Sequence, residues 1–170
     1  SKLCEEKGIR LIHIFEYEWE EPRQRPILEN IICNALGVNT KKLYARNLDI
    51  LELPSASLRE FFDKNNIQGF RGGQVAICLV DKTTKQIYMS YIFGNAFFGK
   101  GKYEWEVIRG ATELGYTIVG GASKIWSYFL KNYKPISCVY YIDYNYFNGN
   151  SLKNLPNMEY IDTQFSFKNF

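Results

Sequence analysis

The chain of 170 residues contains 46% hydrophobic and 23% charged residues and carries a formal net charge of +3 at pH 7. This length and composition predict a globular protein with one domain of ordinary size and a smaller additional unit. The small positive charge excludes a nucleic-acid footprint that covers the whole surface, so such a surface would be local, and it disfavours an acidic mimic of DNA.

The cysteine pattern argues against a metal site. Four cysteines occur singly, without a C-x-x-C pair, and the chain has one His, so zinc is not expected. Cys78 and Cys138 lie in apolar segments and are predicted to be small core residues. The sequence contains no signal peptide, transmembrane run or lipidation motif, and we therefore expect a cytoplasmic protein without a membrane partner.

The first predicted unit covers residues 1–40. Residues 8–19 have apolar side chains on both faces, which predicts a core strand. Residues 27–36 have helical spacing and end at Gly37. We expect this strand and helix to pack either on the rest of the chain or on a second copy, which leaves a homodimer open.

A second unit is predicted over residues 41–170. Alternation over 42–53 predicts a strand that Pro54 closes, and Ser55 or Ser57 is expected to cap a short helix through Phe62. We expect a loop over residues 65–73, where the glycine pair Gly72-Gly73 starts a hairpin over 74–93 with a polar turn at 81–85.

The remaining elements follow in mixed order. The sequence predicts a helix over 103–114, a strand over 117–119, a helix that follows the segment 120–124 and that Pro135 ends, a strand over 136–142, a short helix over 151–155 and a strand over 158–167. Strands and helices in this order predict an α+β fold, with a central mixed, mostly antiparallel sheet flanked by helices.

The segment from Cys4 to Trp19 reads C-E-E-K-G-I-R-L-I-H-I-F-E-Y-E-W. It resembles part of the very-short-patch-repair-like endonucleases of phages and mobile elements. The resemblance implies that His13 and Glu16 derive from a nuclease active site. Tyr17 stands where that family usually has Asp, and the acidic residues that lie upstream in the family are not found here. We interpret the first unit as a nuclease remnant without activity, and His13 as a buried core histidine.

The second unit is similar to the phage DNA-modification protein family named after Mom. The similarity lies in the order of short motifs: Y-A-R at 44–46, N-N-I-Q-G at 65–69, E-V-I-R at 106–109, V-G-G-A-S-K at 119–124 and Y-I-D at 141–143. It implies an N-acetyltransferase-like fold and, in the family, addition of a small group to adenine in DNA. Asn66, Ser123 and Asp143 are the catalytic candidates that it implies. Asn66 replaces the family's usual His, which removes the best base near neutral pH.

Each candidate also has a purely structural interpretation. Asp143 could instead form an Asx turn with Asn145, and the two interpretations are evenly balanced. The Gly120-Gly121 pair, followed by Ser123 and Lys124 at a helix start, could bind an anion, but a plain N-cap by Ser123 is slightly favoured. The acetyl-coenzyme A loop of acetyltransferases is not matched by residues 68–73, so no cofactor is expected.

Bases outnumber acids by three between residues 98 and 135. A solvated helical face and a surface facing phosphates explain this excess equally well. The candidate nucleic-acid or anion-binding residues are Lys100, Lys102, Arg109, Gly121, Ser123, Lys124, Tyr141 and Asn148.

Three functions remain open. The first is a phage-derived nucleic-acid-interacting protein with a Mom-like fold, weakly catalytic or non-catalytic, for which DNA is favoured over RNA. The second is an inhibitor of a host defence system such as CRISPR, which would bind the effector protein or its nucleic acid. The third is a DNA-adenine-modifying transferase of the acyl type. All three place the protein in the cytoplasm of a bacterial host cell.

Overall fold

The structure is a computed structural model that describes residues 2–39, 41–97, 101–147, 149, 152 and 154–161. Its centre is a five-stranded sheet in the order β2-β3-β4-β5-β7, formed by β2 (Asp49–Leu53), β3 (Val75–Val80), β4 (Ile87–Asn95), β5 (Trp105–Thr112) and β7 (Cys138–Tyr140). Neighbouring strands are antiparallel except β5 and β7, which are parallel. The sheet is therefore mixed and mostly antiparallel, and the predicted α+β class is confirmed.

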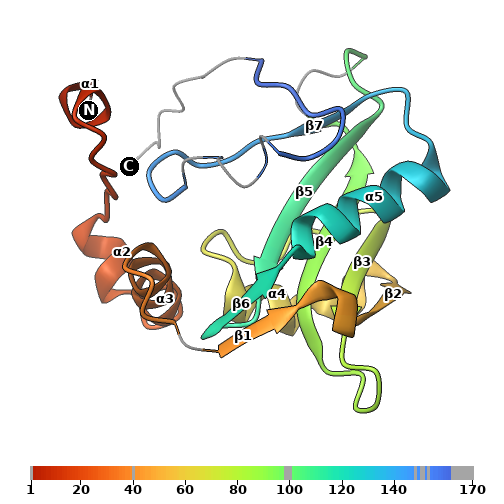
Figure 1. Ribbon diagram of the computed structural model, residues 1–170, viewed down its shortest axis with the longest axis horizontal. Coiled ribbons are helices and arrows are strands. Elements are labelled where there is room, and N and C mark those ends of the chain that lie inside the picture. Colours follow the sequence, from red (N-terminus) through yellow and green to blue (C-terminus); the bar gives the residue numbers. More distant parts are fainter. Residues whose placement is uncertain are drawn as a thin grey trace.

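Helices cover both faces of this sheet, as Figure 1 shows. The helix α5 (Gly121–Tyr133) packs Ile125, Trp126 and Phe129 on one face, where the Phe129 ring stacks on Phe93 with centroids 4.0 Å apart. The helix α4 (Arg59–Asn65) follows the 3-10 turn η2 (Ser55–Leu58) and packs Phe62 on the other face. We call these the α5 face and the α4 face.

The hairpin of β3 and β4 agrees with the sequence. β3 is buried on both faces, because each is covered by a helix. Asp81 starts the connecting turn, where its Oδ1 accepts the backbone N–H groups of Thr83 and Thr84 at 2.8 Å. These bonds also lower the pKa of Asp81. Alternation and turn residues together determine this element.

The helix predicted over 103–114 is wrong, because Trp105–Thr112 is the strand β5. Ile92 lies opposite Arg109 and Phe93 lies opposite Val107, so Ile108 is an extra residue in a β-bulge. The bulge interrupts the alternation of faces. Apolar residues then recur three apart at 105, 108 and 111, a spacing that imitates a helix.

The single strand predicted over 42–53 is two strands joined by a turn. β1 (Lys41–Tyr44) pairs in parallel with β6 (Tyr116–Val119) in a separate two-stranded sheet, whereas β2 pairs with β3. Between them lies the 3-10 turn η1 (Ala45–Asn47). Ala45 and Leu48 are both buried, which holds the turn against the core.

The first 39 residues contain no strand where the structure describes them. Residues 9–15 are extended but outside any sheet, and they lie between α1 (Lys2–Glu6) and α2 (Glu16–Glu20). The predicted strand over 8–19 is therefore wrong. The predicted helix over 27–36 is confirmed as α3 (Arg25–Ala35).

This N-terminal unit packs on the rest of the chain. Ile27, Leu28 and Ile31 of α3 form a buried cluster with Ile67 and Tyr146. Arg23 donates hydrogen bonds of 2.8 to 3.0 Å to the carbonyl oxygens of Asp63, Asn66 and Ile67, at the C-terminal end of α4. Figure 1 shows α2 and α3 beside the sheet, on the side away from α5.

The other predicted elements are partly confirmed. Ser55 and Ser57 do not cap α4, since their hydroxyl groups donate to Gly73 and Pro54 carbonyls. The strand predicted over 136–142 is reduced to β7. Within the predicted strand 158–167, residues 158–161 are not in a strand and 162–170 lie outside the described residues. The predicted helix 151–155 includes residues 151 and 153, which also lie outside them.

The helices in the described part of the chain are all too short or too polar to cross a membrane.

Candidate nucleic-acid interface

The β-bulge in β5 determines where Arg109 lies. Because Ile108 is the extra residue, both Ile108 and Arg109 face α4, where Ile108 packs beside Ile92. Arg109 Nε donates to the carbonyl of Gly69 at 3.1 Å, and Nη1 donates to the carbonyl of Ile108 at 2.7 Å. Burial, and then the nearby Arg71, lower the pKa of Arg109. Its guanidinium is thus half-buried between the strand and the loop after α4.

That loop is held in one conformation by side chains. Asn66 Nδ2 donates to the Gly110 carbonyl at 2.9 Å, and Asn66 Oδ1 accepts the Gln68 N–H at 2.9 Å. Asp63 Oδ1 accepts the Phe70 N–H at 2.8 Å. The nitrogen and the oxygen of the Asn66 side-chain amide are thus both bonded to backbone groups, so this catalytic candidate has an evident structural role.

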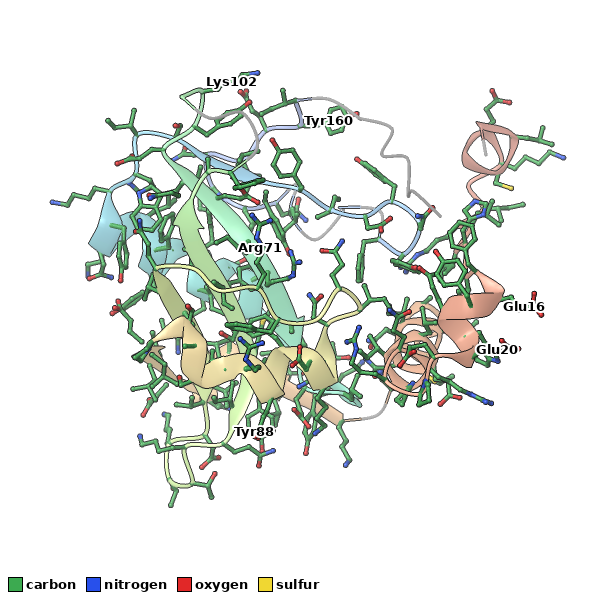
Figure 2. The ribbon with its side chains drawn as sticks, turned by 180° about the vertical axis from the view of Figure 1, so that it is seen from behind. Glu16, Glu20, Arg71, Tyr88, Lys102 and Tyr160 are labelled. Atoms are coloured by element: carbon green, nitrogen blue, oxygen red, sulfur yellow. The ribbon has the colours of Figure 1, made fainter. Side chains whose placement is uncertain are left out.

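Arg71 lies at the end of the same loop, over an aromatic ring. Its guanidinium carbon is 4.8 Å from the centroid of Phe97, which is 65% exposed. Figure 2 shows Arg71 near the middle of the α4 face, with Lys102 at the outer end of the β4–β5 connection. Glu106 of β5 is only 4% exposed, and its Oε2 accepts the Phe97 N–H at 2.8 Å.

Cations and aromatic rings alternate from α4 to the β4–β5 connection. Arg59 lies 4.5 Å from the Phe70 ring, and Lys102 lies 5.3 Å from the Tyr103 ring. Arg71 lies between these pairs, since it follows Phe70 in the loop and contacts Phe97 of the β4–β5 connection. We call this set the basic–aromatic track: Arg59, Phe70, Arg71, Phe97, Lys102 and Tyr103.

Two tyrosines meet across β5 on the α5 face. An added Cβ at Gly110 would lie 2.8 Å from the Tyr140 hydroxyl and 2.8 Å from the Tyr91 ring, so glycine leaves room for both side chains. Burial raises the pKa of Tyr140 to about 12, and the Arg109 guanidinium opposes that shift. Tyr140 therefore stays a neutral phenol at physiological pH.

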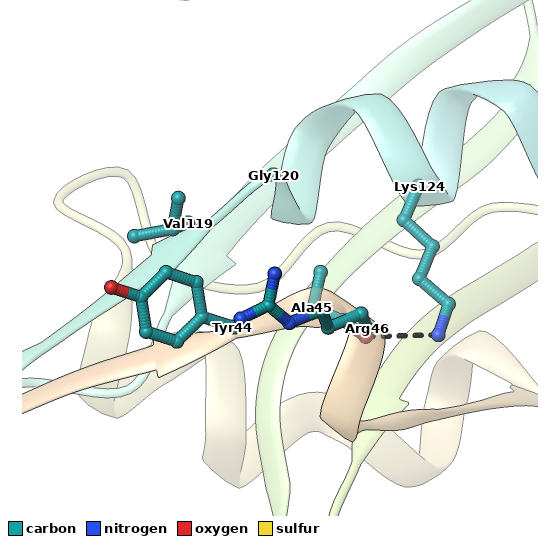
Figure 3. Close-up of a pocket in the computed structure, with 6 residues that line it drawn as sticks. All are labelled: Tyr44, Ala45, Arg46, Val119, Gly120 and Lys124. Carbon is teal, nitrogen blue, oxygen red and sulfur yellow. Dashed lines mark hydrogen bonds between the residues drawn. The ribbon is translucent and has the colours of Figure 1, made fainter.

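Gly120 and Lys124 border an open pocket of about 400 Å³, together with Tyr44, Ala45, Arg46 and Val119. The Lys124 ammonium group is directed at the protein backbone and not into the pocket, because Nζ donates to the carbonyls of Ala45 at 2.9 Å and Leu48 at 2.6 Å. Figure 3 shows this side chain directed at the turn. Its ammonium group fixes η1 between β1 and β2.

The helix start differs from the prediction. Gly120, with φ of +75°, is the N-cap of α5, and the exposed Ser123 does not cap it. The predicted N-cap role of Ser123 is therefore wrong. Gly121 is buried, and an added Cβ there would lie 2.5 Å from the Met89 sulfur. Close packing thus explains Gly121.

Asp143 forms the Asx turn that competed with the catalytic interpretation. Its Oδ1 accepts the Asn145 N–H at 2.9 Å, and its carbonyl accepts the N–H groups of Tyr146 and Phe147. Tyr141 lies just before this turn and is 44% exposed. Lys100 and Asn148 lie outside the described residues.

His13 and Glu16, the two residues that the nuclease resemblance singled out, are both exposed. His13 contributes its backbone N–H to the Asn145 carbonyl at 3.0 Å, and its side chain is not in the core, so the predicted buried histidine is wrong. Glu16 begins α2. Cys78 is fully buried and Cys138 packs at the core edge, as predicted.

The structure thus keeps the predicted binding residues apart. Lys124 binds the η1 turn and Lys102 lies at the outer end of the β4–β5 connection. Arg109 instead lies near Arg71 and Glu106, and both of these contact Phe97. The sequence did not single out Arg71, Glu106 or Phe97. The aromatic content of 16% was the one available signal for Phe97, and it did not distinguish this ring from core aromatics.

Within the described residues, groups of three or more His, Cys, Asp or Glu side chains suited to a metal ion are absent. Comparison of the chain with protein-family models, with curated proteins and with solved structures finds no match.

Proposed function

We propose that this chain is a nucleic-acid-interacting protein of phage origin that works by binding, with little or no catalysis. The observation that carries the proposal is the basic–aromatic track. Proteins that bind single strands combine cations along the backbone path with aromatic side chains on which bases stack. The track has both, at the surface and in alternation.

We further propose the N-acetyltransferase-like fold that the resemblance to the Mom family implies, and the arrangement of the strands supports it. β5 and β7 are parallel neighbours. The chain between them includes α5, which packs on one face of the sheet. They pair over three residue positions only, from Trp105 to Val107, so that the rest of β5 extends beyond β7. We take this arrangement, with the glycine pair before α5, as the N-acetyltransferase-like fold that the resemblance implies.

The environments of the catalytic candidates favour binding over a transferase reaction. Asn66 and Asp143 each use their side chains in backbone hydrogen bonds within a loop. Ser123 lies on the exposed side of α5, and the neighbouring Lys124 is engaged with η1. A general base or nucleophile needs a side chain that can reach the substrate, and these side chains have other roles.

The proposal predicts salt-dependent binding to nucleic acid. We expect fluorescence anisotropy to show binding of a labelled single-stranded oligonucleotide, with affinity that falls as salt rises. The double variant Arg59→Gln/Lys102→Gln should reduce the slope of log affinity against log salt by about 1 to 2. DNA and RNA strands and a duplex are compared in the same titration.

A matched control loses the same charge away from the track. In Lys64→Gln/Lys85→Gln, both cations are already paired, with Glu113 and with Asp49 respectively. This control should leave the slope nearly unchanged. If the wild-type protein fails to bind any of the three nucleic acids at low salt, the proposed function is wrong.

One observation favours the inhibitor as a second candidate. The extended segment before α2 exposes large apolar side chains, including Ile9 at 54%, Leu11 at 40% and Phe15 at 39%. Contiguous exposed apolar side chains are typical of protein interfaces. Purification of the tagged protein from host cells should then recover a defence nuclease, and Leu11→Glu should abolish that recovery.

A further inference from the structure

Arg71 and Arg109 bring two positive charges together on the α4 face. Arg109 is hydrogen-bonded to Gly69, two residues before Arg71 in the loop. Arg71 lies on Phe97, whose N–H binds Glu106 of the same strand as Arg109. After burial, the positive charge of Arg71 also lowers the pKa of Arg109. Neither forms an ion pair with a carboxylate among the described residues. Like charges in a half-buried position are costly unless an anion lies between them.

The nearest carboxylate does not neutralise the pair. Glu106 interacts favourably with Arg109, but its Oε2 is engaged with the Phe97 N–H at 2.8 Å, and Glu106 is 4% exposed. Two guanidinium charges against one carboxylate leave a local charge of +1. A ligand with at least one negative charge would balance it.

The hydrogen-bond donors point to an oxyanion. Arginine carries five N–H donors and no acceptor. Arg109 uses Nε and Nη1 on the backbone, which holds the guanidinium in a fixed orientation. Arg71 packs over Phe97 and has no hydrogen-bond acceptor within the part of the chain that the structure describes. Fixed guanidinium groups with free N–H pairs match the oxygens of phosphate.

We propose that Arg71 and Arg109 together bind one phosphate group, which in the proposed function is a backbone phosphate of the bound strand. Arg109 supplies a positioned charge from the sheet, and Arg71 closes over the phosphate from the loop. The location in the centre of the basic–aromatic track fits a strand that passes from Arg59 to Lys102. The inference rests on the proposed function only for the source of the phosphate.

The experiment combines two readouts on the same proteins. The first follows the Nε–H signal of Arg109 by nuclear magnetic resonance during titration with inorganic phosphate, with chloride at matched ionic strength as the reference. The second measures the affinity for a labelled single-stranded DNA by anisotropy. Arg71→Gln is the test variant, because Arg71 makes no hydrogen bond that the described fold requires. Arg71→Lys keeps the charge without the forked donors.

The control is Arg46→Gln, which removes an arginine that also lies on an aromatic ring, 4.9 Å from the centroid of Tyr44, but outside the track. We expect phosphate to shift the Arg109 signal in the wild type and in Arg46→Gln, but not in Arg71→Gln. Strand affinity should fall about tenfold or more in Arg71→Gln, less in Arg71→Lys, and less than about threefold in Arg46→Gln.

The outcomes separate this inference from the proposed function. If the strand binds Arg71→Gln and Arg46→Gln equally well, the phosphate site is wrong and the binding function stands. If phosphate shifts the Arg109 signal but no strand binds, the site is supported, with free phosphate or a nucleotide as its source, and the proposed function falls. If phosphate has no more effect than chloride, the site is overturned.

Discussion

At the scale of single residues, the adjacent glycines Gly72 and Gly73 meet different surroundings. An added Cβ at Gly73 would lie 2.7 Å from the Phe93 carbonyl oxygen and 2.6 Å from Ile92. At Gly72 the nearest atom would be 3.7 Å away, on the Phe70 ring. Gly73 also exchanges hydrogen bonds with the Ser55 hydroxyl through both backbone groups. The second glycine, not the first, is thus required for close packing at the start of the hairpin.

We therefore expect Gly73→Ala to lower the free energy of unfolding by about 2 to 3 kcal/mol, because backbone and core side chains must shift to admit the methyl group. Gly72→Ala is the matched control and should change it by less than about 1 kcal/mol. Chemical denaturation of both variants measures the difference. Equal stability of the two variants would contradict this account of Gly73.

At the scale of elements, Lys124 decides where the segment after residue 41 turns. Its ammonium group donates to two carbonyl oxygens in and after η1, so the chain leaves β1 and enters β2 in the other sheet. Buried or half-buried carbonyl groups need partners, and the turn supplies few of its own. A residue that the motif suggested for anion binding thus has a structural function.

The substitution Lys124→Met should destabilise the fold by about 2 kcal/mol, since two charge-assisted hydrogen bonds are lost while the aliphatic length is kept. Lys131→Met, on the exposed part of the same helix, is the control and should have little effect. Thermal unfolding followed by circular dichroism compares them. A Lys124→Met variant as stable as the control would show that the bonds to Ala45 and Leu48 contribute nothing.

At the scale of the whole molecule, Arg23 joins the N-terminal unit to α4 and to the loop that follows it. Its three hydrogen bonds go to carbonyl groups in the last turn of α4 and just after it, where the hydrogen-bond ladder of the helix ends. Asn30 adds a bond from the Gly115 N–H at 2.9 Å. Together with the apolar cluster around Leu28 and Tyr146, these contacts show that α3 packs on the rest of the same chain.

Arg23→Gln should loosen this unit before the sheet unfolds. We expect faster amide hydrogen exchange over 25–35, by about tenfold or more, with little change in β3. Arg25→Gln is the control, because Arg25 is exposed and contacts Glu29 and the Trp19 ring, both within the N-terminal unit. If both variants exchange alike, the N-terminal unit does not depend on Arg23.

The sequence predicted well wherever the signal is local. The hairpin of β3 and β4, the helix α3 and the helix α5 follow from apolar periodicity bounded by turn residues, glycine or proline. The Asx turn at Asp143 was one of two interpretations, and it depends on a neighbour two residues away. The candidate site was predicted less well, since only Arg109 of its central residues was named beforehand.

Composition and periodicity therefore determined the α+β class, the hairpin and the two long helices, because hydrophobic alternation and turn chemistry act over a few residues. Tertiary structure alone decided that 105–112 is a strand, that Lys124 serves the η1 turn, and that Arg71 lies beside Arg109. A β-bulge changes which residues of a strand face each side of the sheet. The loop after α4 brings Arg71 near Arg109, which is 38 positions later in the chain. Such contacts depend on how elements pack, which no local spacing of residues records.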